Sequence, residues 1–535
     1  MIKAVRGTRD LLPPDTALWN FVEAAVRDVF RAYNFQEIRT PIFETTELFA
    51  RGVGEETDIV GKEMYTWFDD QRSAETKLED VFLSRQPKSA KQLAPVEFPE
   101  LKYQPRTRLI RSKGKNEFVD YSSSPSPDLL HRLKEYSEIW GQIERRAKLR
   151  LVTDRRLPEG MRRLAGVLDI AITILDPRDS RPSQSLTLRP ENTAGTVRAY
   201  IEHKLWDRGL NKLYYIGPQF RRERPQKGRY RQFYQIGAEV IGPPASGSES
   251  PVRDAEILEM LATLLDRLGI TDWNLELNSV GCPADRAKFN EALRKALEPV
   301  KEKMCADCQR RAVTNPLRVF DCKVPEDQPI IEKLPRISQF LDAPCREHFE
   351  AVQKILTAVG VRFSLNDRLV RGLDYYTRTA FEFTHGALGA QNAILGGGRY
   401  DGLSEALGGP AAPGIGFAIG EDRLVMSLQE KSPAESVLRK PDVYVAPMAG
   451  MNADAARLAR ELRRHDLIVE LGDDAFRLKK SFEAATKAGA KYILIVGENE
   501  VKADAFALKN LASGEQISVP RSDLARKISA REQVD

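Results

Sequence analysis

Apolar and polar side chains alternate most regularly over residues 232–241, and this period of two predicts a strand. A second strand-like run covers residues 212–218, so the two runs form a predicted hairpin. The loop between them carries arginines at positions 221, 222, 224, 229 and 231. The return strand places Gln235 and Glu239 on one face. The hairpin therefore combines a basic tip with an amide and a carboxylate on one side.

Helical spacing of apolar residues predicts helices elsewhere in the chain. One helix follows Asp15, which can cap it, and a strand-like run at 35–42 comes next. A short strand at 186–188 stops at Pro190, and another helix pattern follows. Residues 282–365 are rich in predicted helix.

Strand and helix patterns alternate beyond residue 441, which predicts a compact α/β domain. The predicted strands are 442–446, 467–471, 491–496, 501–509 and 516–519, and the predicted helices are 453–465 and 477–488. Before this domain, the glycine-rich stretch 396–402 predicts a loop whose backbone a ligand can approach.

The length of 535 residues exceeds what one core supports, so three or four domains are expected. A net charge of +5 neither requires nor excludes nucleic acid as a partner. No apolar run reaches the roughly 20 residues of a membrane span, and the N-terminal residues have no apolar signal core. We therefore expect a cytoplasmic location and no membrane contact.

Five cysteines, at positions 282, 305, 308, 322 and 345, are an odd and sparse set for a disulfide framework. Cys305 and Cys308 have the spacing of a zinc-ligand pair, but zinc needs further ligands. Only Cys322 and the more distant Cys345 are available. Buried or free thiols are the favoured interpretation, and zinc is the alternative.

The arginine-rich hairpin suits a phosphate-binding site, because arginine stays charged and offers paired donors. A carboxylate beside an amide can hold an ammonium group. A solvated basic loop is the alternative interpretation. The sequence FRRERPQKGRYRQF, residues 220–233, resembles motif 2 of class II aminoacyl-tRNA synthetases in the form typical of the histidyl-tRNA synthetase family.

Other stretches are similar to the same family. The helix and strand that end at Pro41 resemble motif 1, which implies a homodimer interface. RGLDYY, residues 371–376, resembles the signature that separates this family from other class II enzymes. Residues 414–425, GIGFAIGEDRLV, resemble motif 3, with Arg423 on the helix.

The resemblance implies an α+β fold. It consists of a class II catalytic domain built on an antiparallel sheet, a helical insertion, and a C-terminal α/β anticodon-binding domain. The predicted domains are a split catalytic domain at 1–71, 183–281 and 366–428, an unrecognised basic insertion at 72–182, a helical insertion domain at 282–365 and an anticodon-binding domain at 441–530.

The basic insertion at 72–182 interrupts a hairpin shortly before Glu191. Such a segment can add contacts to RNA, or it can be a surface insertion without a role, since long loops are thermodynamically tolerated. The segments on both sides still match the family, so we predict that the site survives.

The implied activity is that of a histidine--tRNA ligase. It activates L-histidine with ATP to histidyl-adenylate and transfers it to the 3′ end of tRNA(His). Mg²⁺ is expected to enter with ATP, and no metal held by the protein itself is predicted. The alternative is a histidine-sensing paralogue of the ATP phosphoribosyltransferase regulatory type. Such paralogues lack the anticodon-binding domain and typically lose synthetase residues, whereas this chain keeps both.

The resemblance implies catalytic roles for three arginines. Arg221 matches the motif 2 arginine on the α-phosphate, and Arg423 matches the motif 3 arginine on the γ-phosphate. Arg371 matches an arginine near the α-phosphate, where other class II enzymes place a metal ion. Glu223 and Arg229 are further predicted to bind ATP.

The resemblance also implies a set of histidine-binding residues. The set is Glu191, Asn192, Thr193, Gln235, Glu239, Tyr375 and Tyr376. Glu191 and Thr193 lie at the turn that the family uses for the amino group. Glu239 and Tyr376 resemble the pair that contacts the imidazole nitrogens.

Overall fold

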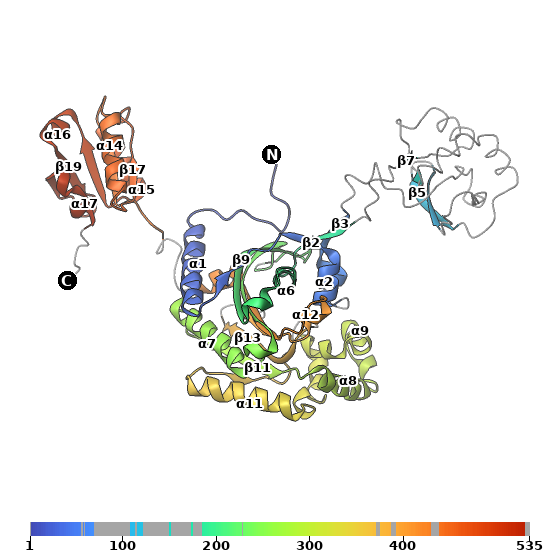
Figure 1. Cartoon of the computed structure of the whole chain (residues 1–535). Coiled ribbons are helices and arrows are strands. Elements are labelled where there is room, and N and C mark those ends of the chain that lie inside the picture. The colour runs from blue at the N-terminus through green and yellow to red at the C-terminus, as the bar shows by residue number, and fades with distance from the viewer. Residues whose placement is uncertain are drawn as a thin grey trace. The chain divides into compact units, whose positions relative to one another are not determined.

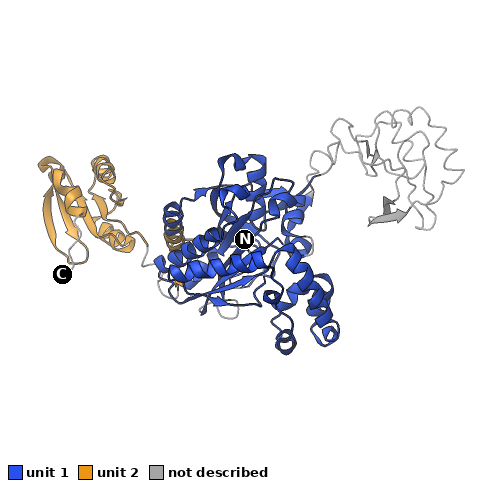
Figure 2. Cartoon of the chain, turned by 60° about the horizontal axis from the view of Figure 1, so that its bottom comes forward, with its two compact units in different colours: residues 1–10, 25–427 blue, residues 11–24, 428–535 orange. Residues whose placement is uncertain are grey.

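The computed structural model describes most of the chain outside the predicted basic insertion. The described residues are 2–54, 57, 59–68, 184–226, 228–370, 375–386, 392–429 and 438–529, with strands β4 (Thr107–Ser112), β5 (Lys115–Asp120), β6 (Leu149–Arg150) and β7 (Thr173–Ile174). The chain divides into two compact units, residues 1–10 with 25–427 and residues 11–24 with 428–535 (Figure 2). Most of the predicted insertion at 72–182 lies outside the described residues, and the predicted domain boundaries stay predictions.

An eight-stranded sheet forms the centre of the first unit (Figure 1). Its order is β1 (Gln36–Glu37), β9 (Asn211–Phe220), β10 (Gln232–Ile241), β15 (Gly414–Gly420), β14 (Ala393–Arg399), β13 (Thr377–His385), β11 (Trp273–Ser279) and β12 (Ser364–Leu365). The strands from β9 to β11 are antiparallel, and only the two edge strands pair in parallel. The predicted α+β class with an antiparallel catalytic sheet is confirmed.

The predicted hairpin lies inside this sheet. Strand β10 has the predicted bounds, and β9 extends the predicted run at both ends. Residues of β10 that point away from Gln235 and Glu239 include Ile236 and Val240, which are fully buried. Burial of this apolar face fixes the register, because a slip of one residue would turn the polar face into the core.

A small antiparallel sheet precedes the hairpin. Strand β8 (Ser185–Leu188) pairs with β2 (Phe43–Thr45) on one side and β3 (Tyr65–Phe68) on the other. The last pair of the β3–β8 ladder is Phe68 with Ser185. Strands β3 and β8 therefore form the hairpin that the predicted insertion interrupts, and Phe68 and Ser185, on either side of the long connecting segment, lie next to each other.

Helices cover and flank these sheets. They are α1 (Asp15–Ala32), α2 (Thr46–Val53), a π-helix (Ile59–Glu63), α6 (Thr193–Glu202), η4 (Leu205–Arg208), η5 (Pro244–Ser246), α7 (Pro251–Arg267), α12 (Leu403–Ala406) and α13 (Glu421–Gln429). In the second half of α1, Phe30 packs edge-on against Tyr214 of β9 and Phe417 of β15. The strand predicted at 35–42 is only the two residues of β1, and the chain is irregular before β2.

A buried ion-pair network joins the sheet to two of its helices. Arg399 of β14 is fully buried and contacts Asp254 of α7 at 2.5 Å and Asp401 at 2.9 Å. Asp254 also accepts a hydrogen bond from His348 Nε2 at 2.8 Å. His348 belongs to α11 (Ala343–Ala358), so this network fixes α7 and α11 against the strand.

The first part of the glycine-rich stretch predicted to be a loop, residues 396–399, belongs instead to β14, whereas residues 400–402 form a turn after it. Glycine is needed here for packing between strands. A Cβ at Gly397 would lie 2.7 Å from the ring of Phe381, and one at Gly398 would lie 2.9 Å from the ring of Tyr376. The loop prediction was wrong because glycine also permits close approach of neighbouring strands.

The helix-rich segment 282–365 is built from short elements. They are α8 (Pro283–Leu297), η6 (Lys301–Lys303), α9 (Ala306–Thr314), η7 (Pro316–Asp321), η8 (Pro325–Asp327), α10 (Gln328–Ile331), η9 (Ile337–Gln339) and α11. Phe289, Leu293 and Phe320 belong to its apolar core. This core also contains the side chains of Cys308, Cys322 and Cys345.

The second unit carries a five-stranded sheet in the order β17-β16-β18-β19-β20. Its elements are β16 (Val443–Pro447), α14 (Asn452–Arg463), β17 (Val469–Leu471), α15 (Leu478–Ala488), β18 (Tyr492–Val496), α16 (Glu498–Ala503), β19 (Ala505–Asn510), β20 (Gln516–Pro520) and α17 (Arg521–Ser529). The predicted α/β organisation is confirmed. The run predicted as a strand at 501–509 begins as the end of α16, and α17 was not predicted.

None of the described helices has both the length and the apolar character needed to cross a membrane.

Candidate functional site

One cavity of about 310 Å³ gathers most of the predicted site residues. Its walls come from strands β9, β10, β13, β14 and β15, from the turn before α6, and from the start of α13. The predicted residues in its lining are Glu191, Thr193, Arg221, Glu223, Arg229, Gln235, Glu239, Tyr375, Tyr376 and Arg423. The tertiary structure thus brings together residues that span more than 230 positions of the sequence.

Glu239 of β10 is fully buried at one end of the cavity. Its carboxylate accepts hydrogen bonds from Thr193 Oγ1 and from Tyr400 Oη, both at 2.7 Å. Burial, with a smaller effect of the negative charge of Glu191, raises the pKa of Glu239 to about 8, although the hydroxyls of Tyr400, Thr193 and Tyr215 oppose the rise. The carboxyl group is therefore poised to exchange a proton near neutral pH.

Glu191 forms the second carboxylate at this end. Its side chain accepts hydrogen bonds from the backbone N–H groups of Thr193 at 2.7 Å and Ala194 at 2.9 Å, at the start of α6. Burial raises the pKa of Glu191, and these backbone donors counteract it. Because a carboxylate has about four acceptor positions, Glu191 can cap the helix and still accept from a ligand.

Gln235 lies between the two carboxylates and the basic end. Its Oε1 is buried and has no hydrogen-bond partner among the residues the structure describes. A buried acceptor without a partner costs about 1–3 kcal/mol. A donor group on a ligand would remove this cost.

Tyrosines surround the carboxylates. The rings of Tyr375 and Tyr376 lie 4.8 Å apart, and Tyr375 also contacts the ring of Tyr400 edge-on. Burial raises the pKa of Tyr375, Tyr400 and Tyr215 well above the ordinary value, so these hydroxyls stay protonated and can donate.

The sequence reasoning missed Tyr400 and Tyr215 as site residues. Tyr215 lies on β9 beside the predicted return strand, where it pairs with Gly237. Tyr400 lies within the predicted glycine-rich loop at 396–402 and directly follows β14. The strand period could have found Tyr215, but no sequence signal shows that Tyr400 reaches Glu239, 161 positions away.

Three arginines, Arg221, Arg229 and Arg423, also line the cavity. Arg221 Nε donates to the carbonyl oxygen of Pro190 at 2.9 Å, and its guanidinium lies over the ring of Phe233. Arg229 pairs with Glu223 at 3.1 Å. Arg221 is therefore held by its Nε, so that its terminal nitrogens are directed toward other groups.

Arg423, in the first turn of α13, donates to the carbonyl oxygen of Ala393 at 2.9 Å. Burial lowers the pKa of Arg423, and the positive charges of Arg229 and Arg221 lower it further. Like charges held this close favour a bound anion, which would relieve their repulsion. Glu223 and Glu382 offset part of this positive charge.

Gly416 keeps space open for the acidic end. It lies opposite Glu239 in the β10–β15 ladder. A Cβ at this position would collide with the carboxylate of Glu239 and come within 2.7 Å of the carbonyl oxygen of Ala238. Glycine is required at position 416 because the carboxylate of Glu239 occupies the space that a side chain on β15 would take.

One predicted site residue among the described ones, Asn192, does not line the cavity. The side chain of Asn192 is buried and accepts from Thr40 Oγ1 at 2.5 Å, so it fixes the turn to the segment before β2. Arg371 lies outside the described residues. Of the predicted histidine-binding set, only Asn192 stands apart from the lining.

The cavity lining combines carboxylates, hydroxyls and guanidinium groups. Carboxylates and neutral hydroxyls suit a ligand with an ammonium group and further donors, while the arginines suit phosphate oxygens. Mg²⁺ prefers carboxylate, phosphate and water oxygens. Glu223 and Glu382 offer carboxylates in this lining next to the arginines, so the donor set fits Mg²⁺ that arrives on a phosphate group.

Two protein-family models match the chain. The model described as histidyl-tRNA synthetase matches residues 167–424. The model described as anticodon binding domain matches residues 442–531. The first match contains the hairpin and every cavity residue named above.

Relatives along the full length carry the same name. A protein of Koribacter versatilis named Histidine--tRNA ligase is 57% identical over 527 residues, which span 98% of this chain and 95% of the relative. One of Solibacter usitatus with that name is 46% identical over 533 residues, spanning 99% of both. The crystal structure of apo S. aureus histidyl-tRNA synthetase matches with 29% identity and a TM-score of 0.65, covering 99% of this chain and all of that one.

Proposed function

Because the chain belongs to the histidyl-tRNA synthetase family, we propose that its polarised cavity is where L-histidine is activated with ATP. The chain is an aminoacyl-tRNA ligase, specifically a histidine--tRNA ligase, by its relation to full-length homologues of that name. One observation carries the proposed site: two buried carboxylates and three arginines line one cavity. An amino acid and a nucleoside triphosphate need these two environments side by side.

In the proposed complex, histidine occupies the acidic end. Glu191 and the free Oε1 of Gln235 accept from its ammonium group. Glu239 forms a hydrogen bond with an imidazole nitrogen, and Thr193 and Tyr400 hold the Glu239 carboxyl group in place through their own hydrogen bonds. Tyr375 and Tyr376 enclose the ring. A site built on buried polar groups discriminates strongly against side chains that leave those groups unpaired.

ATP occupies the basic end in this proposal. Arg221 contacts the α-phosphate, Arg423 the γ-phosphate, and Arg229 with Glu223 the remaining triphosphate oxygens. A histidine carboxylate oxygen then attacks the α-phosphorus in line, and the bond to the departing pyrophosphate breaks. The arginines stabilise the charge that develops on the phosphoryl oxygens. The predicted role of Arg371 at the α-phosphate stays a prediction.

Mg²⁺ enters as part of the ATP complex in this proposal. It would neutralise charge on the triphosphate and favour the bent conformation that the reaction needs. Glu223 and Glu382 are the residues that would hold it.

The second half of the reaction uses tRNA(His). A hydroxyl of its terminal ribose attacks the carbonyl carbon of histidyl-adenylate, and AMP leaves. The C-terminal domain at 442–531 matches the anticodon-binding model and is proposed to bind the anticodon arm. The homodimer implied by the motif 1 resemblance, and the cytoplasmic location, also stay proposals.

The names of the full-length relatives support the ligase over the regulatory paralogue. The deciding experiment is histidine-dependent exchange between pyrophosphate and ATP, run with each amino acid separately. Exchange with histidine alone, followed by charging of tRNA(His), supports the proposal. Histidine binding without any exchange would overturn it in favour of the sensor.

A further inference from the structure

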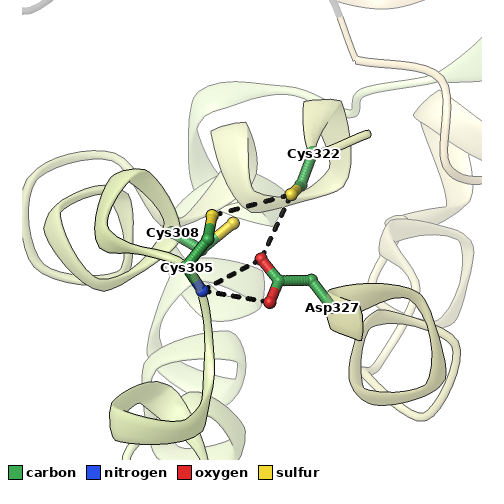
Figure 3. Close-up of side chains that lie close together, drawn as sticks. All are labelled: Cys305, Cys308, Cys322 and Asp327. Atoms are coloured by element: carbon green, nitrogen blue, oxygen red, sulfur yellow. Dashed lines mark hydrogen bonds between the residues drawn. The ribbon is translucent and has the colours of Figure 1, made fainter. Parts of the chain in front are cut away.

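Three cysteines and one aspartate converge inside the helix-rich segment, well apart in sequence from the cavity residues (Figure 3). Cys305 and Cys308 come from the start of α9, Cys322 follows η7, and Asp327 ends η8. The four ligand atoms all lie within 4.8 Å of one another. Cys308, Cys322 and Asp327 are buried.

We propose that Cys305, Cys308, Cys322 and Asp327 bind one structural Zn²⁺ ion. Thiolate and carboxylate are both zinc ligands, and four protein ligands make the closed tetrahedral set of a structural site. The CxxC pair at a helix start supplies two ligands from one turn. Cys322 and Asp327 complete the set from the next two short elements.

The distances support a tetrahedral ion. Zinc–sulfur bonds of about 2.3 Å in a tetrahedron place two sulfurs about 3.8 Å apart. The Sγ atoms of Cys305 and Cys322 are 3.9 Å apart. Asp327 Oδ2 lies 3.2 Å from Cys322 Sγ, close to the roughly 3.5 Å expected for an oxygen and a sulfur on one zinc ion. The four groups therefore need only small shifts to coordinate it.

Backbone donors orient two of the ligands. Asp327 accepts from the N–H of Cys305 at 3.0 Å through Oδ1, and the N–H of Val324 donates to Cys322 Sγ at 3.4 Å. Such contacts from the surrounding backbone are typical of metal sites, because they fix the ligands and stabilise their negative charge. They leave further acceptor positions on the aspartate for a cation.

The ion would tie together elements that are individually short. Helices η7, η8 and α10 have 6, 3 and 4 residues. Elements this short are marginal without tertiary support. A zinc ion that links α9, η7 and η8 supplies that support next to the core formed by Phe289 and Phe320.

A second group provides an internal comparison. Cys282, Asp285, Asp342 and Cys345 also lie close together. Its carboxylates already cap helices: Asp285 accepts from the N–H of Cys282 at 3.2 Å, and Asp342 accepts from the N–H of Cys345 at 2.8 Å. This group is explained by helix capping, so Cys345 serves as the matched control for Cys308.

The test measures metal in the full-length chain, purified without chelators or an affinity tag. Elemental analysis should find about one zinc per chain. Cys308→Ser should lose the zinc, whereas Cys345→Ser should keep it. Replacement by Co²⁺ should give the visible absorption of a tetrahedral ion and a near-ultraviolet band from thiolate ligands. Both bands should be absent from Cys308→Ser.

Three results would overturn the proposal. One is no zinc in the purified chain together with no cobalt spectrum after reduction and addition of Co²⁺. Another is a Cys305–Cys322 disulfide in the intact protein, detected by mass spectrometry. The third is loss of zinc in Cys345→Ser with retention in Cys308→Ser. If Cys308→Ser does not fold, the zinc content and cobalt spectrum of the unmodified chain still decide. None of these readouts depends on histidine activation.

Discussion

Thr193 donates a hydrogen bond of 2.7 Å to Glu239, although 46 positions separate them in the chain. This bond joins the turn that starts α6 to the middle of β10. It helps to position the Glu239 carboxyl group in the cavity and lowers its pKa, against the larger rise that burial causes. The proposed recognition of histidine depends on it.

Replacing Thr193 by Val keeps the shape of the side chain and removes the hydroxyl. We expect the KM for histidine to rise roughly 2- to 10-fold, since a hydrogen bond between neutral groups contributes about 0.5–1.5 kcal/mol and the Glu239 carboxyl, with a pKa of about 8, is mostly protonated at neutral pH. The KM for ATP should not change. Pyrophosphate exchange measures both constants. Thr196→Val is the control, because Thr196 donates to the backbone of Asn192 within α6 and is not in the cavity lining.

The raised pKa of Glu239, about 8 against an ordinary value of 4.5, predicts a pH-dependent stability. The native state holds the proton more tightly than the unfolded state, so the free energy of unfolding falls as pH rises from about 4.5 to about 8. Glu239→Gln removes this dependence. Urea unfolding across this range should show both proteins converging at low pH. At pH 8 the free energy of unfolding of Glu239→Gln should exceed that of the unmodified protein by on the order of a few kcal/mol. If the free energies of unfolding of the two proteins change equally with pH, the raised pKa of Glu239 is contradicted.

Arg221→Lys keeps the charge and loses the paired donors of the guanidinium. We expect the rate of histidine-dependent exchange to fall about 100-fold, the usual cost of losing one preorganised donor at the transition state. Arg222→Lys is the matched control, because the neighbouring Arg222 does not line the cavity and lies near the ring of Tyr65. It should change the rate about twofold at most. Equal losses in both variants would argue against the proposed contact.

Gly416→Ala introduces a methyl group where the carboxylate of Glu239 already lies. We expect a loss of stability of about 1–3 kcal/mol from overpacking, with weaker histidine binding because Glu239 must move. Calorimetric unfolding and titration with histidine measure the two effects. Gly402→Ala, where a Cβ meets no atom within 4 Å, should have neither effect.

Deletion of residues 72–182 tests the interrupted hairpin. Phe68 and Ser185 are paired, so residues 69–71 and 183–184 would remain as a five-residue connection, a length that closes hairpins. We expect histidine-dependent exchange to be retained. A separate comparison of tRNA charging would then show whether the removed segment contributes to tRNA binding. Loss of exchange in a folded deletion protein would contradict the prediction that the site is independent of this segment.

The sequence alone determined the local elements and the chemical character of the site. The strict alternation over residues 232–241 gave the bounds of β10 and the face that carries Gln235 and Glu239. Such patterns are readable because side-chain direction in a strand follows from residue number. The resemblance to motif 2 and motif 3 added Arg221 and Arg423, which lie far apart in the sequence. The structure brings these two arginines into one cavity.

Tertiary structure decided the contacts that sequence spacing does not encode. Tyr400 reaches Glu239 only because β14 and β10 both neighbour β15, and the same packing turns the expected glycine loop into a strand. The turn points Asn192 toward Thr40 and away from the cavity. Asp327 joins three cysteines because short helices fold back on one another. These contacts depend on how distant segments pack, whereas local periodicity reports only which side of its own element a residue occupies.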